Sequence, residues 1–140
     1  MNQYTPALRP DILVVDDYTD ALDVWAIMLG TAGFDVRTAA TGPQALHQVK
    51  TRVPDLIVMD LLLPGLSGLD VARELRSHDA TRHVPLIAVT GCSSDAELAL
   101  ARQSGFASIL RKPCEPPELV DEIRRLLLLK PGPKPAGVPG

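Results

Sequence analysis

Residues 12–17 read ILVVDD, four consecutive apolar residues followed at once by two aspartates. A run this short, without alternation of polar and apolar residues, is typical of a β-strand that is covered on both faces. Strands of that kind occur in parallel sheets with helices on each side, so this stretch already favours an α/β fold.

Three more apolar runs end in the same way, each at a polar side chain. They are LIVM at 56–59 before Asp60, LIAV at 86–89 before Thr90, and SILR at 108–111 before Lys112. Because the carboxyl ends of parallel strands meet at one edge of a sheet, we expect these polar residues to lie together there. Open α/β sheets place their ligand sites at that edge.

Strands and helices are expected to alternate five times, with turn-forming residues such as Gly33 and Pro54 between them. The expected strands are 11–15, 34–38, 55–59, 84–89 and 107–110, and the expected helices are 19–32, 42–51, 67–78, 94–105 and 115–129. Either Ser93 or Ser94 can cap the fourth helix. Alternation at these lengths predicts βαβ units with right-handed crossovers, and therefore a parallel sheet with helices on both faces.

Composition limits the classes of protein that fit. The chain has 140 residues and a mass of 15.0 kDa, the size of one ordinary domain. We expect a loose lead-in at 1–10, one domain at 11–130, and a Pro/Gly-rich tail at 131–140. A net charge of −3 offers no basic surface for nucleic acid, and the apolar stretches are too short to span a bilayer. With no visible leader and no metal-site spacing of Cys92 and Cys114, we expect a cytoplasmic protein with reduced thiols.

The residues at the strand ends suggest a chemistry. The carboxylates of Asp16, Asp17 and Asp60 would repel one another if they meet, so they need a compensating cation, and Mg²⁺ suits an open acidic site. Lys112 adds a positive charge and Thr90 a hydroxyl group. Such a set suits phosphoryl transfer, in which a carboxylate can itself be the nucleophile. Each residue taken singly fits a loop or a helix cap, and only their joint placement indicates a site.

Four motifs in order resemble the receiver domain of two-component response regulators. They are ILVVDD at 12–17, LIVMDLLLPGLSGLD at 56–70, PLIAVTG at 85–91 and ILRKP at 109–113. Each motif alone is weak, but all four at the family's spacing are specific, and the resemblance covers residues 11–129. It implies a flavodoxin-like (βα)5 fold with strand order 2-1-3-4-5, and a cis peptide bond between Lys112 and Pro113.

The resemblance also implies a role for each residue of the site. Asp60 would accept the phosphoryl group, Lys112 would pair with it, and Thr90 would move to hydrogen-bond the phosphoryl group. Three groups would ligate Mg²⁺ directly, namely Asp17, Asp60 and the backbone carbonyl of Leu62, while Asp16 would act through a metal-bound water. Such a domain catalyses only its own phosphorylation and dephosphorylation.

Ile109 departs from the family, which usually has Tyr, Phe or His at this position. In the family this aromatic side chain swings inward with the threonine and carries the signal away. Isoleucine is β-branched and stiff, so we interpret Ile109 as a well-packed strand residue. The paired movement of a threonine and an aromatic side chain, which is usual in the family, then lacks its aromatic residue.

The helix expected at 19–32 is apolar on two faces. We expect the core-facing stripe to comprise Ala21, Val24, Trp25, Met28 and Ala32. We expect Leu22 and Ala26, on the second stripe, to contact the phosphodonor, with ordinary exposed apolar residues as the alternative. Residues 126–129 are four leucines, more than one core face can use, and part of that surface would meet a partner.

The leading hypothesis is a phosphorylation-dependent signalling module. It would receive its phosphoryl group from a histidine kinase or a histidine phosphotransfer protein and change its binding to a downstream target or output domain. A homodimer through the helix at 94–105, the strand at 107–110 and the helix at 115–129 is one such change. The alternative is a phosphorylation-independent pseudo-receiver that acts as a scaffold, which Ile109 favours and the complete acidic site opposes. A phosphatase is disfavoured, because Leu62 stands where such enzymes commonly place a second aspartate.

Overall fold

The structure, a computed structural model, describes residues 9–91 and 94–129. In this part of the chain the strands are β1 (Asp11–Val15), β2 (Asp35–Ala39), β3 (Leu56–Met59), β4 (Leu86–Thr90) and β5 (Ser108–Arg111). The helices are α1 (Thr19–Thr31), α2 (Gly42–Thr51), α3 (Gly68–Arg76), α4 (Asp95–Gln103) and α5 (Pro116–Leu129). Every expected boundary holds to within two residues. Most of the expected lead-in at 1–10, the tail at 131–140, Cys92 and Ser93 lie outside the described residues.

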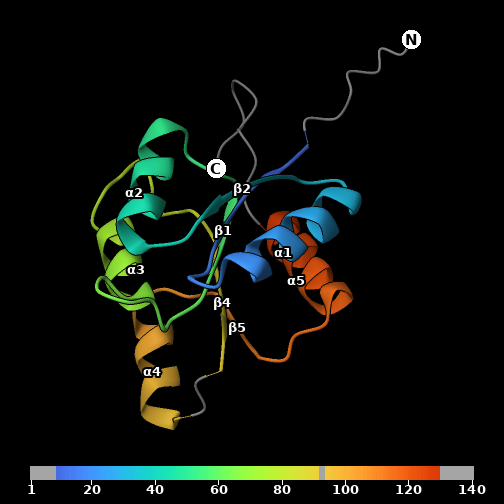
Figure 1. The fold of residues 1–140 in the computed structure, drawn as a ribbon. Helices are drawn as coiled ribbons and strands as arrows, with labels where there is room; N and C mark the ends of the chain where they lie inside the picture. The colour runs from blue at the N-terminus through green and yellow to red at the C-terminus, as the bar shows by residue number, and fades with distance from the viewer. Residues whose placement is uncertain (1–8, 92–93, 130–140) are drawn as a thin grey trace.

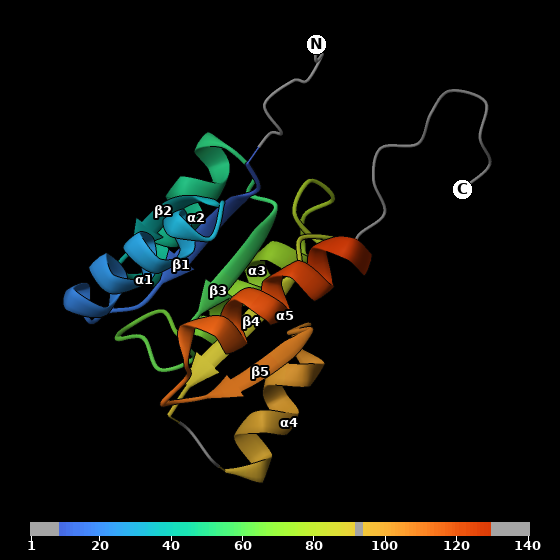
Figure 2. The same cartoon turned by 90° about the vertical axis from the view of Figure 1, so that its right-hand side faces the viewer.

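The five strands form one parallel sheet in the order β2-β1-β3-β4-β5, which confirms the flavodoxin-like topology. Helices α2, α3 and α4 cover one face of the sheet, and α1 and α5 cover the other (Figure 1). Figure 2 shows α1 and α5 from the side on which they lie across the strands. All helices return the chain from the carboxyl edge of the sheet to its amino edge, so the loops that follow the strands gather at one edge.

The core consists of two layers, one on each face of the sheet. Leu13 and Val15 pack into the layer under α2, α3 and α4, whereas Ile12 and Val14 pack into the layer under α1 and α5. The same alternation runs through β3 and β4, whose side chains are all buried. Because both faces are covered, successive residues are apolar and the strands show no polar alternation in sequence.

Side-chain caps position the helices that begin near the carboxyl edge. Ser67 and Asp70 form a capping box at the start of α3, and Thr41 and Ser94 cap α2 and α4. Each cap satisfies backbone amides that the first helical turn leaves without a partner. Within the described residues, no helix is long and apolar enough to cross a membrane.

Candidate functional site

The sheet itself places the predicted residues at its carboxyl edge. The Asp60 amide donates a hydrogen bond to the Val15 carbonyl at 3.0 Å, and the Lys112 amide donates to the Thr90 carbonyl at 3.0 Å. Each of these bonds extends the hydrogen-bond ladder of the sheet by one residue, past the end of β3 at Asp60 and past the end of β5 at Lys112. Asp16, which directly follows β1, therefore lies next to Asp60, and Lys112 lies next to the end of β4.

Three carboxylates meet at this edge. One oxygen from each of Asp16, Asp17 and Asp60 lies within 4.8 Å of the other two. Asp16 and Asp60 are only 4% and 7% exposed, whereas Asp17 is exposed. Two like charges at that separation repel by about 3 kcal/mol at an effective dielectric constant of 20. The cluster therefore favours the binding of a cation.

Lys112 supplies one cation to the cluster. Its Nζ lies 2.8 Å from Oδ2 of Asp60 and 3.2 Å from Oδ2 of Asp16. Burial lowers the pKa of Lys112, but the hydrogen bond to Asp60 and the charges of Asp60 and Asp16 outweigh it, so the net shift is upward. Lys112 is thus charged at neutral pH. One ammonium against three carboxylates leaves an excess of negative charge for a further cation to neutralise.

Backbone amides fix the orientation of the two buried carboxylates. The Leu62 amide donates to Oδ1 of Asp60 at 2.9 Å, and the Tyr18 amide donates to Oδ1 of Asp16 at 3.0 Å. These bonds, from an amide two residues further on, form Asx turns. With Oδ1 on the backbone and Oδ2 on Lys112, the Asp60 carboxylate has little rotational freedom.

The loop after Asp60 lies tightly against its own beginning. A Cβ atom at Gly68 would lie 2.5 Å from the backbone oxygen of Asp60 and 2.9 Å from the Cα of Leu61. Contacts this short are steric clashes, so any other residue at position 68 would force the backbone to shift. Gly65 has a φ of +73°, in the region that glycine adopts readily. These two glycines allow the loop to turn back so that α3 begins directly beside the site.

Thr90 and Ile109 occupy the positions expected of them. Thr90 is fully buried at the end of β4, beside the site. Ile109 pairs with Ala88 in the sheet and packs, half-buried, against the core layer under α2, α3 and α4. The Lys112–Pro113 bond is cis, as expected.

A cleft of about 530 Å³ opens beside the carboxylates, between α1 and the segment that follows β5. Its lining comprises Asp16, Tyr18, Ala21, Trp25, Val89, Lys112, Pro113 and Cys114. Burial, followed by the nearby charge of Glu118, raises the pKa of Cys114 to about 11, so its thiol is unreactive at neutral pH. Trp25 was expected only in the core; it packs there and also borders the site.

A model of the response regulator receiver domain matches residues 12–124. The chain belongs to this family. The receiver domain is 38% identical over 120 residues to the DNA-binding response regulator MtrA of Mycobacterium leprae, and 32% identical over 119 residues to the response regulator PleD of Caulobacter vibrioides. These matches cover 86% and 85% of the chain but 52% of MtrA and 26% of PleD. The chain thus spans about half the length of MtrA and about a quarter of the length of PleD.

Solved structures share the same architecture. The receiver domain matches a CheY-like response regulator receiver domain protein from Methanospirillum hungatei with a TM-score of 0.82 and 27% identity, over 88% of this chain and 97% of that one. It matches a response regulator receiver domain protein from Clostridium thermocellum with a TM-score of 0.80 and 29% identity, over 86% and 96% of the two chains. Receiver domains are signalling modules that bind Mg²⁺ at an acidic pocket, and Asp16, Asp17 and Asp60 form a cluster of carboxylates here.

The expectation for α1 of the receiver domain was wrong for part of the helix, although Trp25 and Ala32 pack against the core as expected. Leu22 is 5% exposed and packs with α5 in the core, so it is not available to a phosphodonor. Val24 and Met28, expected in the core, are 55% and 42% exposed. Both stripes of this helix are apolar, so the pattern could not identify the face that α5 covers. Ala26 is half-buried, and its contact with a donor stays a prediction.

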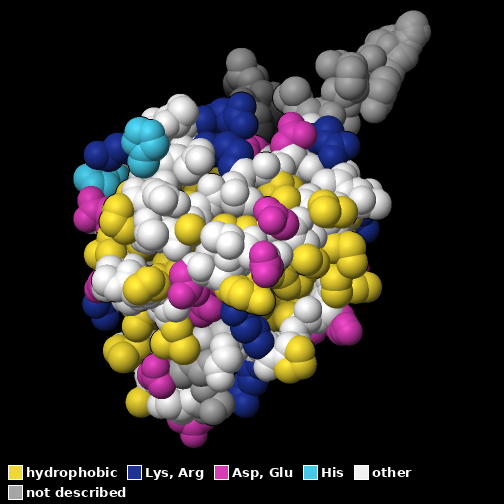
Figure 3. Space-filling model, in the orientation of Figure 1, with side chains coloured by type: hydrophobic (Ala, Val, Ile, Leu, Met, Phe, Trp, Pro, Cys, Tyr) yellow, Lys and Arg dark blue, Asp and Glu magenta, His cyan; other side chains and the backbone are white. Residues whose placement is uncertain are grey.

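Hydrophobic side chains consequently gather on the outer surface of the receiver domain over α1 (Figure 3). The exposed apolar residues there are Tyr18, Val24, Ile27 and Met28, of which Ile27 is 68% exposed. We call these four residues the α1 patch. Of the four, Tyr18 also lines the cleft that contains Asp16 and Lys112.

Proposed function

We propose that this receiver domain accepts a phosphoryl group on Asp60, in a Mg²⁺-dependent reaction, from a histidine kinase or a histidine phosphotransfer protein. The observation that carries the proposal is the Asp60 carboxylate, buried and held on both oxygens beside two further carboxylates and the Lys112 ammonium. That arrangement presents a fixed nucleophile in a site with an excess of negative charge. If each of these residues only capped a helix or a loop, their side chains would not need to meet at one point.

The proposed reaction is a transfer between two side chains. A carboxylate oxygen of Asp60 attacks the phosphorus, the bond between phosphorus and the donor histidine nitrogen breaks, and the imidazole leaves. Lys112, already 2.8 Å from Asp60, neutralises a phosphoryl oxygen as charge moves onto the site. Thr90, buried at the neighbouring strand end, is the hydroxyl that we propose reads the arrival of the group.

The donor atoms of the site fit Mg²⁺, which prefers carboxylate and carbonyl oxygens together with water. Asp17, Asp60 and the backbone carbonyl of Leu62 would hold the ion directly, and Asp16 through a water molecule. When bound, the ion would neutralise the carboxylates and the phosphoryl oxygens. Asp17 is the exposed member of the cluster, so its main role would be to bind the ion.

We propose that the α1 patch, with Ala26 at its edge, contacts the histidine-bearing donor. The patch offers exposed apolar side chains, and its Tyr18 lines the cleft together with Asp16 and Lys112. Ile27→Glu should slow transfer from a phosphorylated histidine kinase and spare labelling by acetyl phosphate. An equal loss in both assays would indicate misfolding instead.

We propose that the signal leaves through the face of α4, β5 and α5, by binding a target, an output domain or a second copy. Leu100 on α4 is 40% exposed, and Ile109 lies half-buried in β5. MtrA is named as DNA-binding, and a whole protein built on this domain could share that activity. The domain itself, with its net charge of −3, is proposed not to contact nucleic acid and to act in the cytoplasm.

Intact mass spectrometry tests the phosphoacceptor role. The full chain is incubated with acetyl phosphate, with and without Mg²⁺, and should gain the mass of one phosphoryl group only with the metal. Asp60→Asn should abolish the gain, whereas Asp79→Asn, at a side chain that is 93% exposed, should leave it unchanged. If the wild type gains no mass, the phosphorylation-independent scaffold, which the aliphatic Ile109 favours, replaces this proposal.

A further inference from the structure

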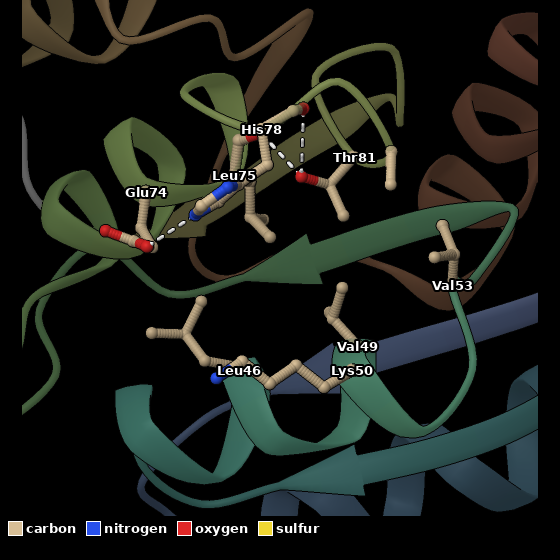
Figure 4. A pocket seen from close by; sticks show the side chains of 9 residues that line it. Leu46, Val49, Lys50, Val53, Glu74, Leu75, His78 and Thr81 are labelled. Carbon is tan, nitrogen blue, oxygen red and sulfur yellow. Dashed lines mark hydrogen bonds and ion pairs between the residues drawn. The ribbon is translucent and has the colours of Figure 1, made fainter.

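Residues of α2, α3 and the segments that follow them line a second cavity (Figure 4). Its volume is about 370 Å³. Val53 and Thr81, which line it, precede β3 and β4, so the cavity lies at the amino edge of the sheet, opposite Asp60. The first residues of α2 and α3 lie at the carboxyl edge, whereas Val49 and Leu75 of the cavity lie further along these helices, about 10 Å away at 1.5 Å per residue.

The walls of the cavity are apolar. Leu46 and Val49 project from α2 and Leu75 from α3, with Val53 closing one end (Figure 4). Val53 is 41% exposed, whereas Val49 and Leu75 are buried at the bottom. A cavity of a few hundred Å³ with apolar walls and a few polar groups is typical of small-molecule sites.

The polar groups at the mouth differ in whether they already have partners. Glu74 and His78 form a pair at 2.8 Å, and the Thr81 hydroxyl donates to the Leu75 carbonyl at 2.6 Å. Lys50 lines the same cavity from α2 and makes no ion pair with any residue in the described ranges 9–91 and 94–129. Its ammonium therefore has no ion-pair partner within those ranges and is available to a ligand.

We propose that this cavity binds a small organic acid, with an aromatic or branched apolar body between α2 and α3 and a carboxylate paired with Lys50. The volume accommodates one such molecule, and the Glu74 carboxylate, held 2.8 Å from His78, lies on α3, whereas Lys50 lies on α2. The site goes beyond phosphoryl transfer, because it uses neither Asp60 nor Mg²⁺. Loss of one function therefore does not imply loss of the other.

Titration of the full ¹⁵N-labelled chain, without Mg²⁺ or a phosphodonor, tests the site by NMR. The probe is 4-phenylbutyrate, and its uncharged analogue 4-phenylbutanol is the control. Amide shifts should concentrate at residues 46–53 and 74–81, with a dissociation constant of about 1 mM, ordinary for so small a ligand. The alcohol should bind about two- to fivefold more weakly, the effect expected for the loss of one exposed ion pair.

Three variants make the test specific. Lys50→Gln should weaken binding of the acid about two- to fivefold and leave the alcohol unaffected. Ala80→Phe, at an exposed position on the lining, should fill the cavity and abolish binding of both. Arg73→Gln, on α3 but outside the cavity, should bind as the wild type does; thermal melts verify that all three fold.

Three results would overturn the proposal. One is the absence of shifts up to about 10 mM acid, well above the expected dissociation constant. The second is equal binding of the acid and the alcohol by the wild type, which would remove the role of Lys50. The third is binding that a folded Ala80→Phe variant retains, which would place the ligand elsewhere, for instance on a surface used by a protein partner.

Discussion

Leu22→Ala tests the orientation of α1, which determines the surface that faces a phosphodonor. Leu22 is 5% exposed and packs in the core layer shared by α1 and α5. Truncating a leucine at such a site removes its transfer free energy and leaves a cavity, with a cost of about 3 kcal/mol. The same truncation at Leu128, which is 86% exposed, should cost less than about 0.5 kcal/mol.

Urea unfolding followed by circular dichroism measures both costs, and thermal melts should show Leu22→Ala about 10 °C below the wild type. The m-value should not change, because both variants unfold from the same compact state. The matched pair separates burial from residue type, since the chemical change is identical. A difference of less than about 1 kcal/mol between the two variants would mean that Leu22 faces solvent, and the α1 patch would then be misassigned.

Further perturbations address the site and its neighbours. Asp17→Asn should stabilise the Mg²⁺-free domain by about 1 kcal/mol, because it removes a solvent-exposed like charge within 4.8 Å of two others. It should also reduce the rise in melting temperature that Mg²⁺ produces, and an unchanged rise would contradict the ligand role. Gly68→Ala should slow labelling of Asp60 and cost about 2 kcal/mol, because its Cβ would meet the Asp60 backbone at 2.5 Å. Gly65→Ala should cost only about 1 kcal/mol for its positive φ; equal slowing of labelling in both would refute the steric explanation. Alkylation of Cys114, followed by peptide mass spectrometry, should have its midpoint at pH about 11, because burial favours the neutral thiol. At pH 9 only about 1% is thiolate, and a midpoint near the ordinary value of 9.0 would show that the thiol is exposed.

The strand ends could be predicted because several physical signals agree there. In β1 the apolar run and the following aspartates mark both a doubly covered strand and the position at which it meets the sheet edge. Parallel pairing then brings Asp16, Asp60 and Lys112 together without any information on side-chain contacts. The residue pairs that stabilise the cluster follow from this topology.

Helix α1 shows where sequence patterns fail. Its residues are apolar on two stripes, so hydrophobicity alone leaves two possible rotations of the helix. Packing against α5 selects Leu22 and Leu29 for the core, and that contact involves residues almost one hundred positions away. The cavity between α2 and α3 was unpredictable for the same reason, since it depends on how closely two helices approach.

Whether Asp60 accepts the phosphoryl group is tested most directly by identifying the modified residue. The chain is treated with acetyl phosphate and Mg²⁺, the acyl phosphate is reduced with borohydride to homoserine, and peptides are sequenced by mass spectrometry. Homoserine should appear at Asp60 alone and only in samples that contained Mg²⁺. Homoserine at Asp16 or Asp17, or at Asp60 to the same extent without the metal, would contradict the proposed site.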